Sequence, residues 1–259
     1  MQSAHSLRKP VLGASTATGT LKLIALVFMM TDHMGKMLFP DVPEMRILGR
    51  IAFPLYAWCL VVGFCYTRNV WRYALRLLAV GLISQPLYMA ALAHTWREPN
   101  IFLTLLLGLL ALVAVAEKPW ERMSPAARAL GRLAAGVGLA LSLLLAQLLG
   151  CDYGWRGVLL IVLLYGARER AGALAAVMAA FCLYWGSSSS TVTSFLGLTL
   201  RPEGAAAVLL SPWLRLQALA VLALPLMLFP WKQNARLPAW AGYGLYPAHL
   251  AVLWLLERI

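Results

Sequence analysis

The chain has 259 residues, of which 61% are hydrophobic and only 12% are charged, and its mean hydropathy is +0.75. Ordinary soluble domains are roughly 45–50% apolar and about 25% charged, so this composition excludes a soluble globular protein and indicates a multi-pass membrane protein. The four cysteines form no CxxC pair, which predicts neither a disulfide framework nor a zinc site.

Nine apolar segments approach or reach the length of about 20 residues that a membrane-spanning helix needs. They are predicted at 21–39, 47–66, 77–94, 101–116, 133–150, 155–167, 171–186, 213–230 and 239–256. The predicted fold class is all-α, a polytopic membrane helix bundle of about nine transmembrane helices. We expect residues 1–20 to form a cytoplasmic N-terminal tail and residues 21–259 to form one transmembrane domain.

Basic residues indicate the orientation, because Lys and Arg concentrate in cytoplasmic loops. One alternate set of loops, beginning with the N-terminal tail, contains Arg8, Lys9, Lys22, Arg68, Arg72, Arg76, Lys118, Arg122, Arg128, Arg132, Arg168, Arg170, Lys232 and Arg236. The other set, with the C-terminus, contains only Arg46, Arg97, Arg156, Arg201 and Arg258. The N-terminus is therefore predicted in the cytoplasm and the C-terminus outside. The net charge of +12 reflects this topology, and we predict no nucleic-acid partner.

The first segment, LKLIALVFMMTDHMGKMLFP, contains ionisable groups, each costing about 2.5–3.5 kcal/mol near the bilayer centre. Helical spacing places Met29, Asp32, His33 and Lys36 on one face. His33 lies about 18 Å along this helix, in its outer half. One interpretation is an Asp32–Lys36 ion pair with a packed histidine. The other is a general base, because a histidine beside a carboxylate suits that role.

The second segment contains Arg50 about one turn inside its outer end, within RILGRIAFPLYAWCLVVGFCYTRN. A buried arginine must face anions or carbonyl groups, so Arg50 is a candidate for binding an anionic group or an oxyanion. Snorkelling to the outer headgroups is the alternative. Pro54 is expected to kink this helix and to free a carbonyl group.

Further polar residues lie within later segments or beside them. Gln85 precedes Pro86 in the third, and Asn100 begins the fourth, where it could equally be an N-cap. Asp152 in CDYGWRG could orient an amine, although an exposed loop acid is usually just solvated. His249, alone on the apolar last segment, would ordinarily be a core residue.

Two other stretches leave alternatives open. Arg68, Arg72 and Arg76 recur every four residues and form a basic stripe that could bind nucleotide phosphates or face anionic lipid. Residues 187–212 are rich in Ser and Thr and then half apolar. They could form an interfacial or re-entrant segment, or a plain connecting loop.

The order of LKLIALVFMMTDHMG, RILGRIAFPLYAWCLVVGFCYTRN, LISQPLY, NIFLTLLLGLL, DYGWRGVLLI and YPAHLAVLWLL resembles the TraX family. These are membrane proteins whose named activity is N-terminal acetylation of pilin in conjugation systems. They in turn resemble a wider group of transmembrane acyltransferases that includes sugar O-acyltransferases and the lysosomal glucosaminide N-acetyltransferase. The resemblance implies a multi-pass acetyltransferase of the bacterial inner membrane, with cytoplasmic acetyl-CoA as donor and a pilin or another periplasmic envelope molecule as acceptor.

The resemblance also implies roles for individual residues. His33 would be the catalytic base, Asp32 its support, and Arg50 would assist the acyl group. We further predict that acetyl-CoA is bound by Arg68, Asn69, Arg72 and Arg76, and that substrate is bound by Gln85, Asn100, Asp152, Tyr153 and His249. No metal site is predicted.

Three other functions compete with this interpretation. An O-acetyltransferase of an envelope glycan would use the same chemistry on a hydroxyl. A proton-coupled secondary transporter would use the buried Asp, His and Lys as a proton relay, but such proteins often contain paired repeats, and none is visible here. A structural assembly factor for a pilus or envelope complex would leave Asp32 and His33 as packing residues.

Overall fold

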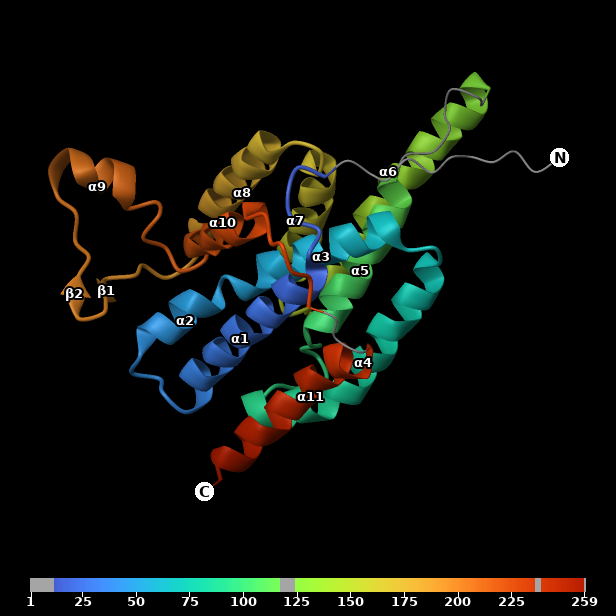
Figure 1. Cartoon of the computed structure of the whole chain (residues 1–259). Helices are drawn as coiled ribbons and strands as arrows, with labels where there is room; N and C mark the ends of the chain where they lie inside the picture. The colour runs from blue at the N-terminus through green and yellow to red at the C-terminus, as the bar shows by residue number, and fades with distance from the viewer. Residues whose placement is uncertain (1–11, 117–123, 236–238, 259) are drawn as a thin grey trace.

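The computed structural model describes residues 12–116, 124–235 and 239–258, and it forms a bundle of helices (Figure 1). Arg8, Lys9, Lys118, Arg122 and Arg236, which contributed to the predicted orientation, lie outside these ranges. The helices are α1 (Thr18–Met37), α2 (Pro43–Gly49), α3 (Ala52–Tyr66), α4 (Val70–Leu92), α5 (Ile101–Val115), α6 (Pro125–Leu148), α7 (Gly154–Ala167), α8 (Ala171–Gly186), α9 (Gly204–Leu210), the 3₁₀ helix η2 (Ala218–Leu222), α10 (Ala223–Leu228) and α11 (Ala239–Leu256). Two short strands pair antiparallel, β1 (Ser194–Phe195) and β2 (Leu198–Thr199).

Each of the nine predicted apolar segments overlaps helix in the structure, although within 213–230 only Ala218–Leu222 and Ala223–Leu228 are helical. Within the described residues, three helices are long and apolar enough to cross a membrane, namely Pro43–Tyr66, Val70–Leu92 and Pro125–Leu148. Most of the other apolar helices are shorter, and α1, which is 20 residues long and contains Lys22, Asp32 and Lys36, does not meet the criterion. The protein is thus a helical membrane protein, whereas the number of crossings and their orientation stay predictions.

The core is centred on α3, whose side chains are buried almost all round. Phe53 and Trp58 are at most 2% exposed, and the Trp58 indole donates a hydrogen bond of 2.8 Å to the carbonyl of Ser15. Small residues bring neighbouring helices together: a Cβ at Gly108 of α5 would overlap Ile161 of α7. Such close packing matters in a membrane. Burying apolar surface against another helix contributes little free energy there, because the lipid tails that it leaves are also apolar.

The second predicted segment is broken where the structure places Arg50. The chain forms α2, turns at Arg50 and Ile51, and continues as α3. Pro54 lies in the first turn of α3 and has no N–H to donate to the carbonyl of Arg50, which explains a helix break at this position. The break turns the side chain of Arg50 toward α1.

The segment at 187–217 leaves the bundle and forms a small lobe beside α2 (Figure 1). Gly197 adopts a left-handed conformation, with a φ of 76°, in the turn between β1 and β2. The lobe is attached to α2, because the backbone N–H of Leu196 donates a 2.7 Å hydrogen bond to Glu44. Residues 187–212 therefore include a hairpin and α9 rather than a plain connection.

All four cysteines are described and unpaired. Cys59, Cys151 and Cys182 are buried, whereas Cys65 is only partly buried and lies next to the last residue of α3. Residues 12–17, in the predicted tail, pack on the bundle: Gly13 donates from its N–H to the carbonyl of Arg168 at 2.7 Å.

Candidate functional site

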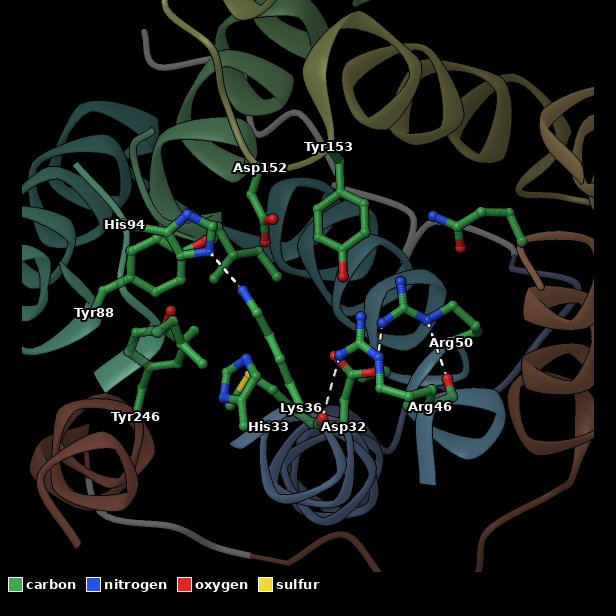
Figure 2. Close-up of a pocket in the computed structure, with 16 residues that line it drawn as sticks. Asp32, His33, Lys36, Arg46, Arg50, Tyr88, His94, Asp152, Tyr153 and Tyr246 are labelled. Carbon is green, nitrogen blue, oxygen red and sulfur yellow. Dashed lines mark hydrogen bonds and ion pairs between the residues drawn. The ribbon is translucent and has the colours of Figure 1, made fainter. Parts of the chain in front are cut away.

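A cavity of about 120 Å³ lies among α1, the junction of α2 and α3, the loops at 93–100 and 149–153, and α11 (Figure 2). All four residues predicted to share one face of α1 line the cavity, namely Met29, Asp32, His33 and Lys36. The lining also includes Arg46, Arg50, Tyr88, His94, Asp152, Tyr153, Gln217 and Tyr246.

Two arginines hold Asp32: Arg46 in α2, and Arg50 immediately after that helix. Nη1 of Arg46 donates to the Asp32 carboxylate at 2.7 Å and to its backbone carbonyl at 3.2 Å. Nη2 of Arg50 bonds to the other carboxylate oxygen, and its Nε donates to the carbonyl of Arg46 at 3.2 Å. The side chains of Asp32 and Arg50 are only 13% and 10% exposed. Two cations on one carboxylate leave the cluster with a net positive charge.

The alternative of an Asp32–Lys36 ion pair was wrong. Asp32 points toward α2, where the arginines satisfy it, while Lys36 extends to the other side of the cavity (Figure 2). Nζ of Lys36 lies 3.0 Å from Nε2 of His94. Helical spacing brought Asp32 and Lys36 near each other, but Arg46 and Arg50 each bond one of the two carboxylate oxygens.

His33 meets His249 across the bundle. Nδ1 of His33 lies 2.9 Å from Nε2 of His249, and the two rings are nearly parallel, at 13°. Nδ1 of His249 lies 3.2 Å from the carbonyl oxygen of Leu245. His249 is 5% exposed, and the ring of Tyr246 packs on it edge to face. The lone histidine of the last segment is thus a direct partner of the predicted base.

His94 continues the polar contacts from the cavity to the exposed loop at 93–100. Its ring stacks on Tyr88 with a centroid separation of 4.8 Å, and its Nδ1 lies 3.4 Å from Glu98. Glu98 accepts a 3.0 Å hydrogen bond from the N–H of Thr95. That bond, with the contact to His94, lowers the pKa of Glu98.

Asp152 and Tyr153 enter the cavity from the loop before α7. Asp152 is accessible to solvent, yet protein atoms surround it closely enough that desolvation raises the pKa of Asp152, against the opposing influence of Arg50. Tyr153 stacks on Phe53, with a centroid separation of 3.9 Å, and its hydroxyl points toward the arginines (Figure 2). The cavity thus combines His33, which His249 contacts from behind the lining, with a positive cluster and a carboxyl group.

The family model described as TraX protein matches residues 17–257, which include every residue of the cavity lining. The chain belongs to the TraX family.

Two curated proteins are similar to this TraX family member. One, from Dichelobacter nodosus, is described as "Probable fimbrial assembly protein FimC, serogroup H1"; it is 30% identical over 255 residues, which cover 90% of this chain and 92% of that protein. The other is an uncharacterized protein of Rickettsia prowazekii (strain Madrid E), 33% identical over 88 residues, or 34% of this chain and 33% of that protein. No solved structure matches the chain significantly.

Other predicted site residues of this TraX family member lie away from the cavity. Arg68, Arg72 and Arg76 are exposed at the opposite end of the bundle, and Arg76 lies over the ring of Tyr73. Arg68 precedes α4, so only Arg72 and Arg76 have the predicted helical spacing. The side chain of Asn69 caps α4 by accepting from the N–H of Arg72. Sixteen residues of helix separate Arg72 from Tyr88 at the cavity, a distance of about 24 Å.

Gln85 and Asn100 make structural bonds. The N–H of Asn100 donates to the Gln85 amide oxygen at 2.9 Å, and the Asn100 side chain caps α5. The Gln85 amide donates to the carbonyl of Glu98 at 3.2 Å. Together they brace the loop that carries His94. The N-cap alternative for Asn100 is confirmed, and the predicted contact of both with substrate stays a prediction.

Sequence reasoning missed several lining residues. Arg46 precedes Arg50 by four residues, a helical spacing that would have put both on one face had the helix been predicted to begin at residue 43 and not at residue 47. His94, Tyr88, Tyr246 and Gln217 come from four separate places in the chain, and no local pattern marks them.

Proposed function

We propose that this protein is a membrane acetyltransferase that transfers an acetyl group from acetyl-CoA to the N-terminal amine of a pilin. Membership of the TraX family and the fimbrial name of the Dichelobacter relative support a pilin-associated acceptor. The observation that carries the proposal is the meeting of His33 with the Arg46–Arg50 cluster in one cavity. A base and a fixed cation are the two groups that acyl transfer from a thioester needs.

In the proposed reaction the amine nitrogen attacks the thioester carbonyl carbon. His33 removes a proton from that nitrogen, and the positive cluster stabilises the charge that develops on the carbonyl oxygen. Collapse of the tetrahedral intermediate breaks the carbon–sulfur bond, and the thiolate of CoA takes the proton from His33. Contributions of about 10²–10⁴-fold for the base and about 10²–10³-fold for the oxyanion donor are typical.

The size of the cavity bears on how acetyl-CoA would bind. A space of about 120 Å³ holds an acetyl group and an amine but not the nucleotide. In this proposal the exposed stripe at Arg68, Arg72 and Arg76 holds the phosphates, and the thioester end of the donor reaches the cavity along α4. Asp152, whose carboxyl group faces the cavity, orients the incoming amine.

The test uses purified protein in lipid nanodiscs with acetyl-CoA and a mature pilin. Intact mass and peptide sequencing should locate one acetyl group on the N-terminal amine. His33→Ala should abolish the product while the protein stays folded and inserted. Near-normal turnover in that variant would remove His33 from the mechanism, and release of CoA without a change in pilin would direct the search to another acceptor, such as a glycan hydroxyl.

A proton-coupled transporter is the second candidate, and the run from Lys36 through His94 to Glu98 favours it. These contacts connect the cavity to an exposed loop, as a proton path would. Transport predicts pH-driven uptake into proteoliposomes without cleavage of a thioester. Thioester cleavage that depends on an acceptor would instead support the acetyltransferase.

A further inference from the structure

We infer that His249 is a positioning residue that fixes the tautomer of His33, so that the free lone pair of His33 lies on Nε2. The catalytic role of this tautomer rests on the proposed function. The hydrogen-bond assignment rests only on the positions of the atoms.

The direction of the hydrogen bonds follows from one fixed acceptor. The carbonyl oxygen of Leu245 can only accept, so Nδ1 of His249, 3.2 Å away, donates to it. A neutral imidazole has one donor and one acceptor, which leaves Nε2 of His249 as the acceptor. Nδ1 of His33, 2.9 Å from that nitrogen, must therefore donate. The lone pair of His33 is thereby assigned to Nε2.

The surroundings favour two neutral rings over a shared positive charge. Lys36, Arg46 and Arg50 line the same cavity and repel a further cation, while Asp32 is already bonded to both arginines and Asp152 lies on the opposite wall. His249 is held in place by Tyr246, which packs edge to face on it and on Phe102, with centroid separations of 5.3 and 5.0 Å. The ring that fixes the tautomer is thus itself immobilised.

The consequence for the reaction is specific. Nε2 of His33 accepts the proton of the attacking amine, while its Nδ1–H stays hydrogen-bonded to His249. The imidazolium then returns the proton from Nε2 to the departing sulfur, so His249 gains and loses none. If His249 were protonated, both of its nitrogens would donate, Nδ1 of His33 would have to accept, and the base would be lost.

The first test reads the tautomer without any reaction. The chain has only four histidines, so ¹⁵N-histidine NMR of the protein in nanodiscs is tractable, and His33→Gln assigns the His33 signals by their loss. Wild-type His33 is expected as the Nδ1–H tautomer. His249→Gln, whose amide oxygen can accept at the same place, should preserve that tautomer, and His249→Leu should lose it. The Nε2–H tautomer in wild type would overturn the inference.

The second test uses turnover. In His249→Leu, kcat should fall by about 10²-fold with little change in the KM for pilin, and His249→Gln should recover much of the loss. If His249 had only a structural role, His249→Leu and His249→Gln would lose thermal stability equally and would have the same kcat. That result would also overturn the inference. A wild-type protein that has the Nδ1–H tautomer but transfers no acetyl group would sink the proposed function and uphold the hydrogen-bond assignment.

Discussion

Arg50 bonds to Asp32 of α1 from just beyond Gly49, the last residue of α2, where Asp32 leaves no room for a side chain. A Cβ at Gly49 would overlap the Asp32 carboxylate. Glycine here is thus a requirement of the ion pair rather than of the backbone, because the two helices could not otherwise bring aspartate and arginine together.

Gly49→Ala is expected to lower the free energy of unfolding by about 1–3 kcal/mol, since the added methyl group must displace Asp32. Acetyl transfer should fall with it. Thermal unfolding in detergent and turnover in nanodiscs measure the two effects. Gly166→Ala is the matched control, because a Cβ at that helical position meets no atom within 4 Å. Equal behaviour of the two variants would contradict the assignment.

Arg50→Lys should be more damaging than Arg46→Lys. Arg50 uses two different nitrogens, Nε and Nη2, for its two bonds, and one ammonium cannot replace both. Arg46 makes both of its bonds to Asp32 from Nη1, which a lysine Nζ can imitate. The loss at Arg50 should be about 1.5–3 kcal/mol in stability, together with a lower turnover rate. Full activity of Arg50→Lys would leave Arg50 as an anchor only.

Asp152 should make stability depend on pH. Its pKa is raised above the ordinary value of 3.8, so the folded protein binds this proton more tightly than the unfolded chain. The free energy of unfolding therefore falls as pH rises from the ordinary value through the raised one. Asp152→Asn should match wild type below this interval and be more stable above it. Melting temperatures across a pH series test this, with the exposed Asp41→Asn as control; parallel curves for wild type and Asp152→Asn would refute it.

The basic stripe gives a prediction about where acetyl-CoA binds. Arg68→Gln and Arg72→Gln should raise the KM for acetyl-CoA with little effect on the KM for pilin, because Arg72 lies about 24 Å along α4 from the cavity. Arg132→Gln, an exposed arginine of α6, is the control.

Sealed vesicles of known orientation complete that test, with acetyl-CoA and pilin supplied on chosen sides. Product is expected when acetyl-CoA is on the side of the stripe and pilin on the side of the cavity. Product formed only when both are on one side would overturn the path along α4, even with His33 essential.

The sequence predicted the helices well because apolar length and the spacing of Met29, Asp32, His33 and Lys36 are local properties. It failed where partners come from distant segments. His33 and His249 are 216 residues apart, and only the packing of α11 beside α1 and α4 brings them together. Arg46 was missed as a partner of Asp32 for a different reason: 43–46 was predicted as part of a loop, so Arg46 was not considered together with Arg50.

The partial exposure of Cys65 has a practical consequence for deciding the orientation. The other three thiols are buried, so a membrane-impermeant maleimide has a single accessible target in the wild-type sequence. The predicted orientation places that target at the inner face, next to the basic stripe. Intact cells should then remain unlabelled and inverted vesicles should be labelled, and the native chain reports its own topology without an engineered cysteine.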